Sequence, residues 1–97
     1  MAKYVILVNW TEQGVANAKD TVSRTEQARN LAKQHGSDFD LFLWTLGRYD
    51  VIAVLDAPDD ETAAALTMSV GGQGSVRTET LRAFTAEEVN GIIGKLD

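Results

Sequence analysis

The chain contains no cysteine, and its 97 residues include only one histidine and one proline. Without cysteine the protein can form neither a disulfide nor a thiolate metal site, and it has no thiol nucleophile. The single histidine, His35, has no second imidazole with which to share a metal ion. Its place at the end of a predicted helix suits a basic group near the negative end of the helix dipole. We therefore expect neither a metal site nor a cofactor.

Long apolar runs and excess positive charge are missing as well. The longest apolar runs hold about eight residues, well short of the roughly 20 that cross a bilayer. Nine Lys and Arg against 14 Asp and Glu give a net charge of −5. An acidic domain repels phosphate backbones and anionic lipids, so we expect neither nucleic acid nor a membrane as a partner. The N-terminus lacks the residue order of a signal peptide, which makes the cytoplasm the expected location.

What the chain does have is the composition of one folded domain over residues 1–97. Hydrophobic residues make up 44% and charged residues 24%, as in an ordinary globular protein. A chain of this length buries only roughly 60–65% of the surface that its unfolded form exposes. Association with further copies of itself would therefore add appreciable stability.

The stretch from Leu41 to Leu55 organises the rest of the sequence. Two apolar runs rich in aromatic and β-branched residues flank Gly47, a pattern typical of two antiparallel strands joined by a tight turn. We expect these strands over 39–45 and 48–57. The polar trio Arg48, Tyr49 and Asp50 would then open the second strand.

The remaining segments alternate between strand and helix signals. Thr11 is placed to cap a weak helix that restarts near Asp20, and Asp59 to cap an Ala-rich helix. Thr85 and Glu88 have the spacing of a capping box. The expected elements are a strand over 3–10, helices over 12–18 and 22–35, a helix from 60 to the glycines at 71–74, a strand over 75–84, and a C-terminal helix.

This order of elements is the split βαβ pattern of the ferredoxin-like fold, in the α+β class. It predicts a βαββαβ topology, in which two helices cover one face of a four-stranded antiparallel sheet. The first and third strands would be central, and the C-terminal helix would follow the fourth strand.

Both faces of the predicted sheet are apolar, although the helices can cover only one. Side chains alternate between the two faces along a strand. The opposed sets are Tyr4, Ile6, Val8 and Trp10 against Val5, Leu7 and Asn9 in the first strand, Phe42 and Trp44 against Phe39, Leu41 and Leu43 in the second, and Val51, Ala53 and Leu55 against Ile52 and Val54 in the third.

An uncovered apolar face of several hundred Å² is rare in a monomer. We expect a second copy of the same sheet to cover it, which predicts a homodimer through the sheet face and leaves room for a higher oligomer. The competing explanation is a monomer whose C-terminal helix folds back over that face.

The segments 44–50 and 76–84 carry a resemblance to a known family. Together with the strand at the N-terminus and the Ala57-Pro58-Asp59-Asp60-Glu61 segment, they resemble the GYD-domain family over essentially the whole chain. The residues that name the family correspond to Gly47, Tyr49 and Asp50. The resemblance implies a ferredoxin-like, dimeric α+β-barrel type of structure, and it implies no established biochemical role.

The polar trio after Gly47 has two interpretations. In the structural one, Gly47 adopts an unusual backbone angle, Asp50 accepts hydrogen bonds from nearby amides and Arg48 pairs with a carboxylate. In the functional one, the guanidinium of Arg48 and the phenol of Tyr49 recognise a small anionic or aromatic ligand. Tyr49 and Asp50 would point to opposite faces of a strand, which argues against one shared pocket.

Further candidate ligand-binding residues are charged or aromatic. Arg77 and Arg82 are either anion anchors or the ordinary charges of an edge strand. Trp10 and Trp44 either line an apolar cavity or belong to the core or a dimer contact. Asn9 is a polar residue in an apolar strand and needs a partner if it is buried. Asp38 and Asp40, by contrast, are expected to be solvated.

These residues support three functional hypotheses. The first is a non-enzymatic homo-oligomeric domain, with a candidate site for a small apolar or anionic molecule between sheet and helices or between subunits. The second is a cofactor-independent oxygenase or isomerase acting on small aromatic substrates, with contributions from Asn9, Tyr49 and Arg82. The third is a structural protein that assembles into rings or cages. Because no complete catalytic set is present, we favour the first.

Overall fold

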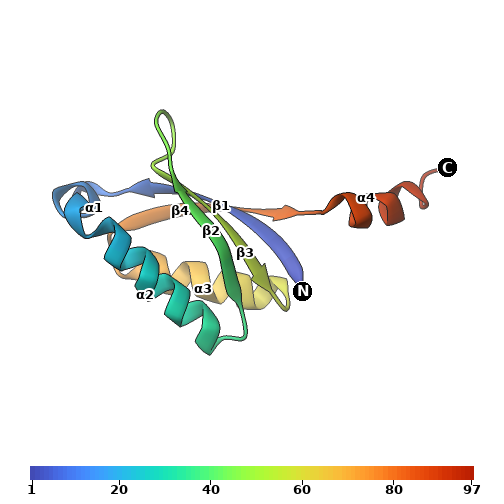
Figure 1. The fold of residues 1–97 in the computed structure, drawn as a ribbon, viewed down its shortest axis with the longest axis horizontal. Helices are drawn as coiled ribbons and strands as arrows, with labels where there is room; N and C mark the ends of the chain where they lie inside the picture. The colour runs from blue at the N-terminus through green and yellow to red at the C-terminus, as the bar shows by residue number, and fades with distance from the viewer.

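A computed structural model describes all 97 residues and contains one four-stranded antiparallel sheet in the order β2-β3-β1-β4. Helices α2 and α3 lie on one face of this sheet (Figure 1). The predicted ferredoxin-like topology, with the first and third strands central, is confirmed. In chain order the elements are β1 (Ala2–Trp10), α1 (Glu12–Ala16), the single 3-10 turn η1 (Ala18–Asp20), α2 (Thr21–Gln34), β2 (Asp38–Trp44), β3 (Val51–Ala57), α3 (Asp60–Gly72), β4 (Val76–Ala83) and α4 (Ala86–Ile93).

The core lies between the sheet and these two helices. In β3, every second residue is buried, from Val51 to Ala57, as expected of a strand with one covered face. Leu55 of this strand and Leu66 of α3 are the largest side chains that are fully enclosed. None of the helices has the length and apolar character that crossing a membrane requires.

The helix caps follow the sequence signals. The side chain of Thr11 accepts a hydrogen bond from the amide of Gly14, and that of Asp59 accepts one from Thr62 at 2.8 Å. Each satisfies an amide that the helix itself leaves unpaired. The expected break before α2 is also present, because η1 separates the five-residue α1 from the helix that begins at Thr21.

The hairpin differs from the prediction in where its second strand begins. β3 starts at Val51 rather than at residue 48, so Arg48, Tyr49 and Asp50 belong to the connecting loop. Gly47 has a φ of +100°, which side-chain-bearing residues rarely adopt. The loop is closed by Thr45, whose amide donates to the Asp50 carbonyl and whose hydroxyl donates to the Tyr49 carbonyl, at 2.9 and 2.6 Å.

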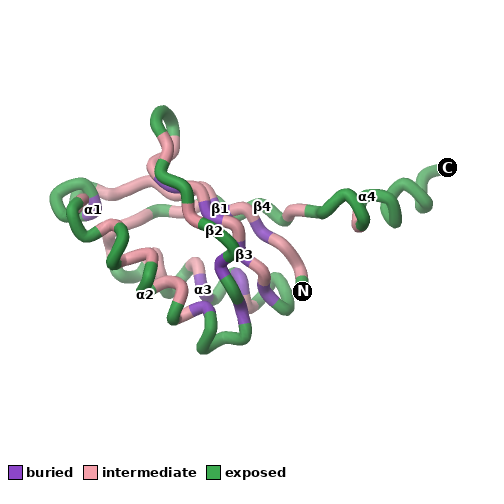
Figure 2. The backbone as a smooth tube through the Cα atoms, in the orientation of Figure 1, coloured by how far each residue is buried: buried purple, intermediate pink, exposed green.

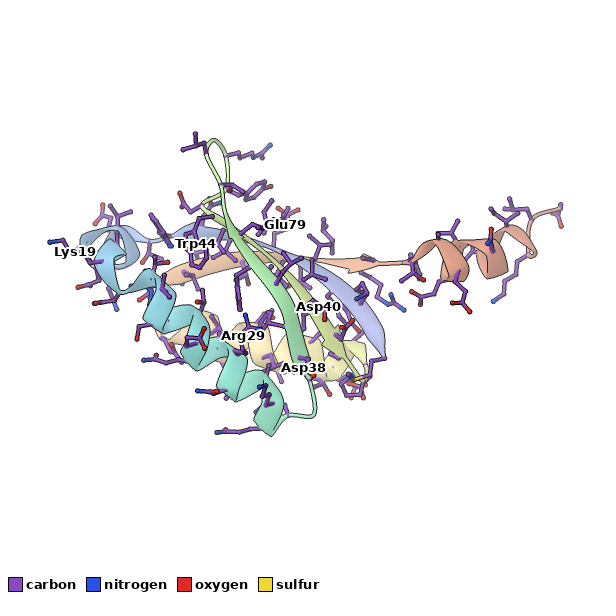
Figure 3. All side chains as sticks on the ribbon, in the orientation of Figure 1. Lys19, Arg29, Asp38, Asp40, Trp44 and Glu79 are labelled. Carbon is purple, nitrogen blue, oxygen red and sulfur yellow. The ribbon has the colours of Figure 1, made fainter.

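A β-bulge in β2 contradicts a second prediction, the face of the sheet on which Phe39 lies. The pairing with β3 shifts between Phe39 and Leu41, so Phe39 turns toward the helices instead of sharing a face with Leu41. Its ring packs 4.7 Å from that of Phe42. The Phe39 carbonyl accepts a hydrogen bond from Arg29 of α2 at 2.6 Å, which supplies a partner where the ladder is irregular. Figure 3 shows Arg29 reaching from α2 toward β2.

Asp38 and Asp40 are both exposed, as expected, but Asp40 also has a partner. Its carboxylate accepts a hydrogen bond from Lys3 at 2.7 Å, and the same ammonium group lies 2.8 Å from Asp56. The hydrogen bond from Lys3 holds the pKa of Asp40 below its usual range, and the two carboxylates raise the pKa of Lys3. Lys3 therefore ties β1 to its neighbour β3 and to β2, the edge strand beyond β3.

Helix α4 does not fold back over the sheet. It begins at the predicted capping box of Thr85 and Glu88, and it projects away from the rest of the molecule (Figure 1). Figure 2 shows this segment exposed over almost its whole length. The monomeric alternative, in which this helix seals the uncovered face, is not what the protein adopts.

Candidate functional site

Two surfaces of the domain could bind another molecule: a cavity on the helix-covered side and the bare face of the sheet. The cavity has a volume of about 80 Å³, is partly open to solvent, and lies between the sheet, α2 and α3. Its walls are mainly apolar, with hydroxyl groups from threonines on both helices and on β4. An engineered apolar cavity of ~150 Å³ binds benzene, so this one suits a smaller molecule or a single aliphatic side chain.

Small side chains on the two helices leave this space open. Thr25 and Ala28 of α2 face Thr67 and Val70 of α3 across it. The Ala-rich part of α3 does lie close to the sheet, as its composition indicates, because Ala63 is buried there. Farther along the helix the gap widens into the cavity. The signal in the sequence was a set of small residues at helical spacing on both helices, but small residues alone do not distinguish close packing from a void.

The two tryptophans lie in different places relative to the cavity. Trp10, at the end of β1, forms part of its wall. Trp44 lies outside the wall, and its indole N–H donates to the Thr21 hydroxyl at 2.9 Å. Figure 3 places Trp44 beside the start of α2. Since Thr21 lines the cavity, Trp44 contacts the rim without reaching the interior.

The loop after Gly47 is tied to the central strand β1 and to the edge strand β4. The Asp50 carboxylate accepts a hydrogen bond from the Trp10 amide at 2.8 Å, and the Asp50 amide donates to the Val8 carbonyl at 2.8 Å. The Tyr49 hydroxyl lies 3.1 Å from a carboxylate oxygen of Glu79 on β4. These contacts favour the structural interpretation of the trio, because each acidic or phenolic group already has a partner within the protomer.

Arg48 makes only a loose contact. Its guanidinium carbon lies 5.8 Å from the centre of the Tyr49 ring, and its side chain is exposed. Leu46, two residues earlier in the same loop, is completely exposed. The expected ion pair between Arg48 and a carboxylate is not formed.

The remaining candidates are divided between the two ends and the two faces of the sheet. Asn9 pairs with Arg77 in the β1–β4 ladder, whereas Arg82 pairs with Tyr4 and shares the helix-covered face with it. Arg77 and Arg82 are five residues apart on β4, which is roughly 17 Å along an antiparallel strand. Tyr49 lies at the Asn9 end. A single protomer therefore does not bring Asn9, Tyr49 and Arg82 into one site.

Arg82 instead takes part in a small aromatic cluster. Its guanidinium lies over the rings of Tyr4 and Phe84, at 5.6 and 4.5 Å from their centres. The buried Tyr4 hydroxyl donates a short hydrogen bond of 2.5 Å to Asp60 at the start of α3. Burial and the Asp60 carboxylate together raise the pKa of Tyr4 to about 12, so this phenol stays protonated at neutral pH.

The face of the sheet away from α2 and α3, here called the open face, is the larger of the two surfaces. Two rows of side chains cross it, one along each set of paired positions. The first row is Leu41, Val54, Val5 and Leu81, and the second is Leu43, Ile52, Leu7 and Glu79. Figure 3 shows Glu79, at the β4 end of the second row, on the side of the sheet away from the helices.

The surface of the protomer is larger than its mass predicts. Its accessible area is 6250 Å², whereas a compact monomer of 10.5 kDa exposes about 5400 Å². Its radius of gyration is 14.5 Å, against about 12.5 Å for a compact domain of this length. The excess area, about 800 Å², equals what one partner contributes to a protein–protein interface of standard size.

Comparison with known proteins gives a family and one relative. The chain is 27% identical over 93 residues to the glutamine synthetase and cystathionine beta-lyase binding protein of Thermus thermophilus. The alignment covers 92% of this chain and 95% of the relative. The profile of the GYD domain matches residues 4–93, which include the open face, the cavity and the whole of α4. The chain therefore belongs to the GYD domain family.

Proposed function

We propose that this protein is a non-catalytic binding domain that works as a homo-oligomer, pairing through its open face and binding other proteins. The observation that carries the proposal is the open face, whose two apolar rows have no cover within the protomer. Each 100 Å² of apolar surface that a partner covers contributes roughly 2.5 kcal/mol before the costs of association. A second copy offers a surface of the same size and apolar character.

The capacity to bind other proteins rests on the relative. That protein is named for binding glutamine synthetase and cystathionine beta-lyase, and the similarity extends over nearly the whole of both chains. We propose these two enzymes, taken from the organism that encodes this chain, as the first partners to test. The cytoplasm, where reducing conditions suit a cysteine-free chain, is the location we propose.

Sedimentation of the purified protein tests the pairing. Wild type should behave as a dimer or larger oligomer at micromolar concentration, and Leu43→Lys should dissociate it, since the charge falls inside the second apolar row. The matched control is Met68→Lys, which places the same charge on an exposed apolar position of α3, outside the open face. A wild-type monomer at every concentration, or equal loss of association in both variants, would contradict the proposal.

Calorimetry with the purified enzymes tests the second part. We expect saturable binding of at least one of them to the wild-type oligomer. No detectable heat with either enzyme would reject them as partners without touching self-association.

The cavity favours a second candidate function, the binding of a very small apolar molecule. Xenon is a suitable probe, because it binds in small, mainly apolar cavities. Xenon should shift the NMR signal of the Trp10 indole more than that of Trp44, and Val70→Phe should abolish the shift by filling the space. Equal, weak shifts for both indoles would exclude the cavity as a binding site.

A further inference from the structure

Helix α4 is an apolar helix without a partner in its own protomer. Val89, Ile92, Ile93 and Leu96 recur at helical spacing and share one side of the segment. All four are exposed, Ile93 to 54% and Leu96 to 71%. We refer to residues 84–97 as the arm.

The arm is ordered from its first turn even though nothing covers it. The Thr85 hydroxyl accepts from the Glu88 amide, and the Glu88 carboxylate accepts from the Thr85 amide. The backbone amide of Thr85 lowers the pKa of Glu88, which keeps this cap ionised. Arg82 adds a contact of 3.7 Å to Glu88 and stacks on Phe84. The arm is thus held at a defined angle to the end of β4.

The arm cannot reach the most distant apolar residues of its own sheet in this position. It leaves the sheet at β4, whereas Leu41 and Leu43 lie on β2, the opposite edge, with β1 and β3 in between. Figure 1 shows α4 pointing outward from the sheet. The arm and β2 are therefore two apolar surfaces of one chain that remain apart in the protomer.

We propose that the arm of each protomer packs on the open face of a second copy, against Leu41 and Leu43 of β2, in a reciprocal exchange. The inference rests on the proposed self-association and adds the segment that completes the interface. Both surfaces are apolar, both lie at free edges of the sheet, and one row of the open face joins them through Leu81, three residues before Phe84. In a two-fold dimer each contact of this kind occurs twice.

The absence of cysteine allows a direct test with single-cysteine variants. Ile93→Cys is mixed with Leu41→Cys, allowed to exchange subunits, and treated with a short thiol-bridging reagent. We expect a covalent pair between the two different variants. The matched control replaces Leu41→Cys with Met68→Cys, an exposed position on α3 that the arm should not reach. Equal yields in both mixtures would overturn the exchange, as would a bridge within one chain of the double variant Ile93→Cys, Leu41→Cys.

Removal of residues 85–97 provides the second measurement. Because the arm packs on none of the core, the shortened chain should keep the circular dichroism and the unfolding midpoint of a protomer measured at high dilution. Its dimer dissociation constant should rise at least a hundredfold. An unchanged dissociation constant would overturn the arm contact while leaving pairing through the open face intact. A wild-type chain that never dimerises would overturn both proposals.

Discussion

The two faces of the sheet have similar apolar side chains and opposite surroundings. On the helix-covered face, Ile6 and Leu55 are almost completely enclosed, and α2 and α3 supply the cover. On the open face, Leu43 is 56% exposed, and no element of the protomer lies over it. Alternation within a strand explains why both faces are apolar, but cover for the second face has to come from outside the protomer.

The two faces of the sheet contribute to different properties, one to the stability of the protomer and the other to its assembly. Side chains between sheet and helices are removed from water when one chain folds, so they contribute to the folding of the protomer. Those on the open face leave water only when another molecule arrives, so they contribute in proportion to its concentration. Substitutions on the helix-covered face should therefore lower the unfolding free energy of the protomer, whereas substitutions on the open face should mainly weaken self-association.

The largest effect is expected from Leu55→Ala, because Leu55 is fully buried in the core. Removing its side-chain atoms leaves a void and should lower the free energy of unfolding by about 2–5 kcal/mol. Leu43→Ala removes the same atoms from the open face. In urea unfolding at high dilution, Leu43→Ala should cost less than about 1 kcal/mol, and its cost should grow with protein concentration. Equal costs at high dilution would show that the open face is already covered in the monomer.

A smaller effect is expected from Gly14→Ala, which tests the helix-covered side at its edge. A Cβ atom built on Gly14 would lie 2.1 Å from the Ser75 carbonyl oxygen and 3.0 Å from the Trp10 side chain. Helix α1 would have to move away from the start of β4, at a cost of about 1–3 kcal/mol. Gly71→Ala is the control, since a Cβ there meets nothing within 4 Å. Equal unfolding free energies for the two variants would mean that α1 is not closely packed.

The elements with strong local signals could be predicted from the sequence. The caps at Thr11, Asp59 and Thr85 depend on a few neighbouring residues, and the strands depend on alternation over a short run. The order of elements then leaves few possible topologies, which is why the order of the strands in the sheet could be predicted. The break between α1 and α2 could also be predicted, because Gly14 and Asn17 weaken the first helix.

The features that were not predicted depend on contacts between distant segments. One extra residue at Asp40 turns the side chain of Phe39 to the other face of the sheet. The groups that bind this bulge come from other elements: Lys3 of β1 pairs with Asp40, and Arg29 of α2 donates to the Phe39 carbonyl. The sequence of residues 48–50 is compatible with the start of a strand, and only the hydrogen bonds between Asp50 and β1 show that these residues form a loop. The cavity depends on how far two helices diverge, and periodicity carries no information on that distance. The amphipathic pattern of α4 indicates that it packs on an apolar surface without specifying which chain supplies it.

Asp50 provides a test at the boundary between the two faces. Asp50→Ala leaves the Trp10 amide without its acceptor and should cost about 1–2 kcal/mol of unfolding free energy. Asp50→Asn keeps an acceptor oxygen and should lose less. Both should leave self-association nearly unchanged if the loop acts only as a tie. A tenfold or greater loss of association in Asp50→Asn, with normal stability, would instead assign the loop to the interface.

The smallest effect concerns the ion pair between Lys3 and Asp40, at the rim of the open face. Because Lys3 lowers the pKa of Asp40 in the folded chain, the unfolded chain binds the proton more readily. The stabilisation is therefore complete above the ordinary aspartate pKa of about 3.9 and declines as the pH falls through the lower folded value.

Half-exposed pairs of this kind contribute little, so Asp40→Asn should change the unfolding free energy at pH 7 less than any substitution above. The difference between wild type and Asp40→Asn should shrink as the solution is acidified below the ordinary aspartate pKa of about 3.9. Lys3 retains Asp56 as a partner in the variant, which confines the change to one contact. A difference that persists unaltered in acid would mean that Asp40 acts through packing in the bulge and not through its charge.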